Sequence, residues 1–93
     1  MTYQTEFPDF TLDVTIPDGF RDDSYRNDTM PRFTKELPHG QTLTIWVDYA
    51  DRTLSEYPDE PRFLAELMSF DGEYVETLPT DNWQTILDFI AEY

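Results

Sequence analysis

Residues 62–78 read RFLAELMSFDGEYVETL, and the structure of this stretch is the main open point of the fold. Phe63, Leu64, Leu67 and Met68 have a spacing that suits a helix. Asp71-Gly72 is nevertheless a typical tight turn between antiparallel strands, and apolar residues resume directly after it. We therefore favour a β-hairpin, with a helix over residues 62–70 as the alternative.

Upstream of this segment, alternating side chains predict further strands. Within residues 43–49, apolar residues alternate with Thr44, Trp46 and Asp48. Residues 32–37 form a second strand, joined to the first by the short loop Pro38-His39-Gly40-Gln41. Residues 10–16 alternate strictly and predict another half-buried strand. Residues 3–7 repeat this period more weakly and are a candidate edge strand.

The C-terminal residues predict an amphipathic helix. Thr80, Asp81 and Asn82 are residue types that cap helix N-termini. The apolar residues that follow at helical spacing are Trp83, Ile86, Leu87 and Ile90. The expected fold is one α+β domain over residues 1–93. It is an antiparallel sheet of four to five strands, with this helix packed on it and Asp88 and Glu92 facing water.

Acidity is the strongest feature of the composition. The 20 Asp and Glu residues outnumber the 6 Lys and Arg residues and give a net charge of −14, and no basic residue follows Arg62. A chain of this charge repels nucleic acids and anionic membranes, so we expect neither as a direct partner. Its natural complement is a basic protein surface. The absence of an apolar run long enough to span a bilayer and of a basic leader suggests a cytoplasmic protein.

Catalytic and metal-binding motifs are missing. The only histidine, His39, lies in a Pro-His-Gly turn, the chain has no cysteine, and it contains three glycines. No nucleophile elbow or phosphate-binding loop is present, so we predict no enzymatic activity and no cofactor. Loose carboxylate groups, Asp48 with Asp51 or the three aspartates of residues 22–28, do not match a calcium-binding loop. We therefore predict no metal site.

Two long polar loops, over residues 18–31 and 50–61, supply the candidate contact residues. Their acidic members are Asp22, Asp23, Asp28, Asp51, Glu56, Asp59 and Glu60. Tyr25 and Tyr57 are aromatic residues of the same loops that we expect to be exposed. A second candidate acidic face consists of Glu73, Glu76, Asp88 and Glu92. Trp46 is either a buried residue of a second layer, which we favour, or an exposed anchor.

In size, charge and lack of cysteine, the chain resembles small phage-encoded inhibitors such as anti-CRISPR proteins and other DNA mimics. The resemblance includes no aligned motif, so no residue roles carry over from those families. It implies a non-catalytic inhibitor that occupies the DNA-binding surface of a CRISPR-Cas subunit or another DNA-binding protein. Two alternatives remain: an acidic interaction or immunity-type domain with one basic partner, and a salt-adapted domain.

Overall fold

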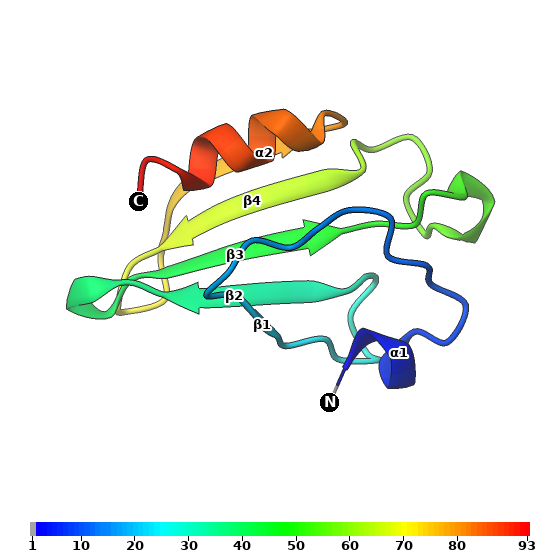
Figure 1. The fold of residues 1–93 in the computed structure, drawn as a ribbon, viewed down its shortest axis with the longest axis horizontal. Helices are drawn as coiled ribbons and strands as arrows, with labels where there is room; N and C mark the ends of the chain where they lie inside the picture. Colours follow the sequence, from blue (N-terminus) through cyan, green and yellow to red (C-terminus); the bar gives the residue numbers. More distant parts are fainter. Residues whose placement is uncertain (1) are drawn as a thin grey trace.

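The computed structural model describes residues 2–93 and contains a five-stranded antiparallel sheet in the order β1-β2-β3-β4-β5 (Figure 1). The strands are β1 (Arg21–Asp22), β2 (Arg32–Glu36), β3 (Thr42–Val47), β4 (Phe63–Met68) and β5 (Tyr74–Thr80). The helices are α1 (Tyr3–Glu6) and α2 (Trp83–Ile90), with 3-10 turns at Pro38–Gly40 and Arg52–Leu54. The α+β class with a C-terminal helix on an antiparallel sheet is confirmed.

The hairpin at Asp71-Gly72 is also confirmed, and the helical alternative for residues 62–70 is excluded. β4 and β5 pair antiparallel, with Leu64 opposite Pro79 and Ala65 opposite Leu78. Apolar spacing in β4 looked helical because both faces of the strand carry apolar residues. Phe63, Ala65 and Leu67 enter the core, whereas Leu64 and Met68 lie on the opposite face.

We call the sheet face covered by α2 the inner face, and the opposite one the outer face. The inner face supplies most of the core, namely Phe33, Leu43, Ile45, Val47, Phe63, Ala65 and Leu67. From α2, Ile86 and Phe89 are buried against it, and Trp83 and Ile90 pack at the margin. The side chain of Asn82 accepts a hydrogen bond from the Thr85 N–H at 3.3 Å, as expected of an N-cap. Phe89 is a core residue that the predicted stripe omitted.

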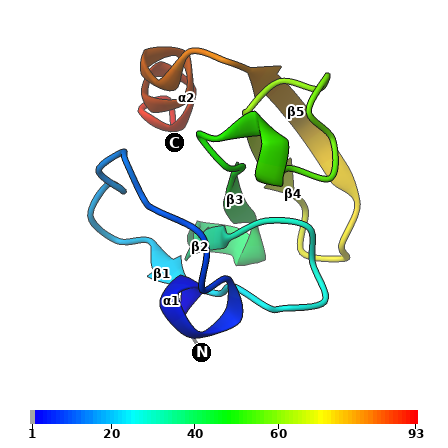
Figure 2. The same ribbon diagram turned by 90° about the vertical axis from the view of Figure 1, so that its right-hand side faces the viewer.

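The strand predicted over residues 10–16 is wrong. This segment is extended but joins none of the described strands, and it crosses the inner face on the same side as α2 (Figures 1 and 2). Phe10 is buried, and Leu12, Val14 and Ile16 pack against the core, so the alternation in burial is real. Both sides of β2, β3 and β4 are occupied by neighbouring strands, and the segment pairs with neither edge strand, β1 or β5. It lies over the inner face and forms a covering layer beside α2 instead of a sixth strand.

The candidate edge strand over residues 3–7 is also wrong, because these residues form the short helix α1. Thr2 and Thr5 hydrogen-bond reciprocally across its first turn, which favours a helical start. The Tyr3 ring packs edge-on against Phe10, with ring centroids 5.7 Å apart. One edge of the sheet is instead β1, two residues within the long polar loop predicted over residues 18–31.

Candidate functional site

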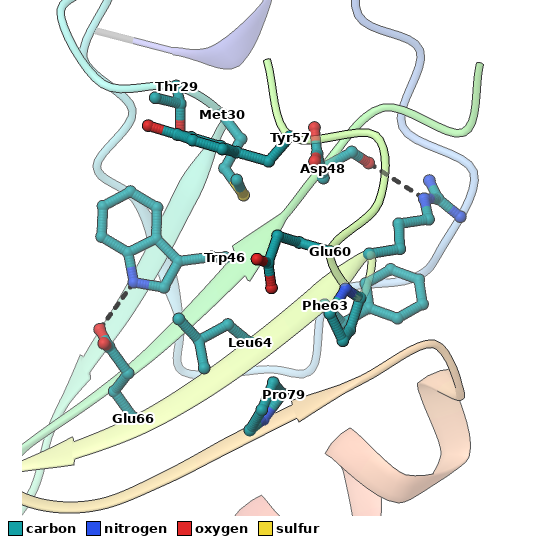
Figure 3. A pocket seen from close by; sticks show the side chains of 12 residues that line it. Thr29, Met30, Trp46, Asp48, Tyr57, Glu60, Phe63, Leu64, Glu66 and Pro79 are labelled. Carbon is teal, nitrogen blue, oxygen red and sulfur yellow. Dashed lines mark hydrogen bonds between the residues drawn. The ribbon is translucent and has the colours of Figure 1, made fainter. Parts of the chain in front are cut away.

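The outer face of the sheet carries a hollow near its centre. Cross-strand pairing places Trp46 between Arg32 and Leu64, and Leu64 next to Pro79. Thr29, Met30, Tyr57, Glu60 and Pro61 lie beside this row and line an open hollow of about 330 Å³ (Figure 3). We call it the outer-face hollow and define it by six of its lining residues: Met30, Trp46, Tyr57, Glu60, Leu64 and Glu66.

Glu66 is the most unusual residue in the outer-face hollow. Only 8% of its surface is exposed, although its side chain is a carboxylate. The indole Nε1–H of Trp46 donates a hydrogen bond of 2.7 Å to its Oε1 (Figure 3). Within residues 2–93, no hydrogen bond reaches Oε2, and no Lys or Arg nitrogen lies within 4 Å of the carboxylate. Glu66 therefore lacks a countercharge within the described part of the chain.

Trp46 is neither fully buried in a second layer nor an exposed anchor, the two possibilities that the sequence left open. It is half-buried, with its indole forming one wall of the outer-face hollow. The Arg32 guanidinium lies 5.4 Å from the centre of the Trp46 ring, in a cation–π arrangement. Trp46 is thus fixed on two sides, by Arg32 and by its hydrogen bond to Glu66.

Asp48, a second buried carboxylate at the hollow, is fully satisfied. Its side chain is 1% exposed and pairs with the Arg52 guanidinium at 3.2 Å. The Ser55 hydroxyl donates to Asp48 Oδ2 at 2.6 Å, and the Tyr49 N–H donates to Oδ1 at 2.7 Å. Arg52 also donates to the backbone oxygens of Tyr57 and Glu60, at 3.1 and 2.9 Å. These bonds hold the loop over residues 50–61 in place beside the sheet.

The predicted contact residues of the first loop are partly used within the fold. Asp22 accepts hydrogen bonds from the backbone N–H groups of Tyr3 and Ser24, at 2.8 and 3.1 Å. Asp23 lies 3.9 Å from the Arg32 guanidinium. Tyr25 is exposed, whereas Asp28 is half-buried and its Oδ2 is buried without a hydrogen-bond partner among the described residues. A contact role for this loop therefore rests chiefly on Tyr25.

In the second loop, the predicted residues are more accessible. Glu56, Asp59 and Glu60 are exposed, as is Tyr57, and Tyr57 and Glu60 line the outer-face hollow. Asp51 is exposed as well, and it accepts hydrogen bonds from the Thr53 hydroxyl and N–H, which lower the pKa of the Asp51 carboxyl. The two long loops meet at the hollow, where Thr29 and Met30 lie beside Tyr57.

The four carboxylates of the second candidate face are all exposed, in β5, its turn and the α2 region. The Tyr93 hydroxyl donates a hydrogen bond to Glu76 at 2.5 Å. That bond, together with the charges of Glu76 and Glu92, raises the pKa of the Tyr93 phenol. Asp88 accepts a hydrogen bond from the Gln84 amide at 2.9 Å. Glu76 and Glu92 therefore both lie close enough to the Tyr93 phenol to affect its pKa.

All the arginines form ion pairs within the described part of the molecule, whereas most of the carboxylates do not. Each of the five arginines forms an ion pair with a carboxylate: Arg21 with Glu36, Arg26 with Glu6, Arg32 with Asp23, Arg52 with Asp48, and Arg62 with Asp13. Five of the 20 carboxylates are thus compensated, and the other 15 have no such partner within residues 2–93. All seven carboxylates after Arg62 belong to the uncompensated set.

Sequence reasoning did not identify Glu66, Met30 and Leu64 as members of one site. Trp46 was singled out, but its partner Glu66 lies 20 positions away and was counted only as one of many acidic residues. The sequence feature that could have identified Glu66 is its place as the one carboxylate within an otherwise apolar strand, β4. Such a residue must face either water or a polar partner.

In the described part of the chain, no three His, Asp or Glu side chains converge so as to hold a metal ion, including the aspartates considered for calcium. Over the same residues, no helix has the length and apolar character needed to cross a membrane. No protein-family model, curated protein or solved structure matches this chain.

Proposed function

We propose that this chain is a non-catalytic inhibitor that binds the basic, nucleic-acid-binding surface of another protein in the cytoplasm, as an anti-CRISPR or similar DNA-mimic protein does. The observation that carries the proposal is that the carboxylates far outnumber the basic side chains that could pair with them. All the arginines are held by internal ion pairs, and 15 carboxylates have no arginine or lysine partner among the described residues. The surface therefore offers negative charge that the chain itself does not compensate.

A surface of this kind competes with DNA for the same groups. Duplex DNA carries one negative charge per roughly 1.7 Å of its axis, and basic grooves present Lys and Arg to those phosphates. Carboxylates held on a folded domain attract the same side chains and accelerate association with them. Because these charges are exposed, salt should screen the attraction and weaken the complex.

The partner is sought by immobilising the protein, passing a bacterial lysate over it and eluting with a salt gradient. A captured nucleic-acid-binding protein that competing duplex DNA displaces supports the proposal. A captured partner that DNA does not displace supports an immunity-type interaction instead.

Charge reversal then tests the electrostatic mechanism on the captured partner. Glu56→Lys with Asp59→Lys changes the second loop, and Glu73→Lys with Glu92→Lys changes the C-terminal face; both pairs are exposed. Asp9→Lys with Asp18→Lys is the matched control, because it alters net charge equally at exposed positions outside both groups. We expect one of the first two variants to lose binding while the control retains it. Unchanged binding after both reversals contradicts the mechanism.

A further inference from the structure

We propose that the outer-face hollow binds the side chain of an arginine supplied by the partner, with Glu66 receiving its guanidinium. The inference deepens the proposed function and rests on it for the source of the arginine. The presence of an arginine site is a property of the hollow itself and can be tested without the partner.

The first support is the uncompensated charge of Glu66. Glu66 is largely buried, yet its Oε2 remains open to solvent, since the buried side-chain atoms without a hydrogen-bond partner in the described chain are Asp28 Oδ2 and Arg32 Nε. A largely buried carboxylate loses part of its hydration and is stabilised by a countercharge. Asp48 at the same hollow meets this requirement through Arg52 and Ser55, whereas Glu66 has a single hydrogen bond from a neutral indole. A cation entering the hollow would supply the missing countercharge. The free oxygen Oε2 is the acceptor available to it.

The second support is the shape and chemistry of the walls. Trp46, Leu64 and Pro79 form one side, and Met30 and Tyr57 extend over it from the loops (Figure 3). Apolar walls of this kind suit the aliphatic stem of a long basic side chain, and aromatic faces attract a cation. Glu60 on the rim adds a second carboxylate near the entrance. The volume of about 330 Å³ falls at the lower end of the range for ligand pockets, roughly 300 to 1,000 Å³.

Arginine fits these features better than lysine or a metal ion. Guanidinium is less strongly hydrated than ammonium, so its transfer into a largely apolar hollow costs less. Its several N–H donors can bond Oε2 and a second acceptor at once. A divalent cation would require several oxygen ligands around one point, and no such set exists within residues 2–93.

Nuclear magnetic resonance tests the inference directly, because the chain has only two tryptophans. The indole N–H of Trp46 is bonded to Glu66 inside the hollow, and Trp83 lies in α2 at the core margin. The ¹⁵N-labelled protein is titrated with the peptide acetyl-Gly-Arg-Gly-amide at constant salt. We expect the Trp46 indole signal to shift and saturate, with little change at Trp83. The citrulline peptide, which has the same shape without the charge, should bind about tenfold more weakly or not at all.

Two variants with the same change in charge separate a specific site from general attraction to an acidic protein. Glu66→Gln keeps an oxygen that can accept the Trp46 N–H but removes the charge, and should weaken arginine-peptide binding about tenfold. Asp18→Asn removes the charge of an exposed carboxylate outside the hollow and outside both candidate contact groups, and should leave the affinity unchanged. Equal binding of the citrulline peptide, or equal affinity of the Glu66→Gln variant, overturns the inference.

The two proposals fail in distinguishable ways. If the arginine peptide does not bind the hollow while duplex DNA still displaces a captured partner, the arginine site is wrong and the proposed function stands. If the peptide binds specifically but the captured partner is insensitive to DNA, the arginine site stands and DNA mimicry is wrong.

Discussion

The guanidinium of Arg62 forms an ion pair with the carboxylate of Asp13, 49 positions earlier in the chain, and one of its nitrogens lies 2.9 Å from Asp13 Oδ2. The same guanidinium donates through Nε to the backbone oxygen of Asp48 at 3.0 Å. Arg62 thus connects the crossing segment over residues 10–16 to the end of β3 and the start of β4. The segment has no strand neighbour among the described residues, so this bridge and its apolar side chains hold it over the sheet.

Replacing Asp13 by asparagine should destabilise the fold by about 0.5 to 1 kcal/mol at neutral pH, the magnitude of a partly exposed ion pair. Arg62 lowers the pKa of Asp13 chiefly by hydrogen bonding. The pair's contribution is therefore complete above the unfolded-state pKa of about 3.9, and it is lost as pH falls through the lower folded-state value. Urea denaturation of wild type and Asp13→Asn from pH 7 to pH 2 should show their difference in unfolding free energy shrinking in acid.

Asp18→Asn is the control for this experiment, since Asp18 is exposed and lies outside the Arg62 ion pair. It should change stability little at any pH. A stability difference for Asp13→Asn that persists undiminished at pH 2 would show that the ion pair is not its cause.

Gly40 in the β2–β3 turn should tolerate alanine less well than Gly72 in the β4–β5 turn. Both have positive φ, +81° and +85°, where a side chain costs roughly 1–2 kcal/mol. A Cβ at Gly40 would lie 2.9 Å from the Cβ of Phe70, whereas a Cβ at Gly72 would meet nothing within 4 Å. We expect Gly40→Ala to show the larger loss in chemical denaturation. Equal losses would mean that the two turns do not touch as described.

Helix α2 should depend on Ile86 more than on its neighbour Leu87. Ile86 is 0% exposed and belongs to the core, while Leu87 is only half-buried. Ile86→Ala should cost about 2 to 5 kcal/mol, the range for removing a fully buried aliphatic side chain, and Leu87→Ala clearly less. Thermal melts followed by circular dichroism measure both. The reverse order would place the other face of α2 on the sheet.

Salt dependence separates the proposed inhibitor from the salt-adapted alternative. We expect the protein to be folded in dilute buffer, because an extensive inner-face core and five ion pairs support it. Its melting temperature should rise by a few degrees between about 0.02 and 0.2 M NaCl, as repulsion among the unpaired carboxylates is screened. A chain that is unfolded in dilute buffer and folds only in molar salt would support salt adaptation.

Prediction from sequence succeeded where the signal was local. The Asp71-Gly72 turn, the short loop before β3 and the Asn82 cap each depend on a few adjacent residues whose backbone preferences are strong. It failed at residues 10–16, where the alternation correctly indicated one buried side. Alternation of apolar and polar residues indicates which side chains avoid water. It does not reveal whether the backbone forms hydrogen bonds with a neighbouring strand.

The candidate site was less accessible to sequence reasoning than the fold. Asp22 and Asp51 were predicted to contact a partner, yet both accept hydrogen bonds from backbone N–H groups of the chain itself. Glu66 was not selected, because its importance comes from its position beneath two loops and beside Trp46. Only the folded chain distinguishes a carboxylate that caps a turn from one that lacks a countercharge.

By itself, the sequence determined the α+β class, the C-terminal helix and the net charge of −14, and it favoured the hairpin over a helix at residues 62–70, since these follow from neighbouring residues or from composition. The tertiary structure alone decided which carboxylates are compensated and where the outer-face hollow forms. Both depend on distances between residues far apart in the chain, such as Asp13 with Arg62 and Trp46 with Glu66. Charge pairing requires contact within a few ångströms, and chain folding, rather than composition, creates that contact.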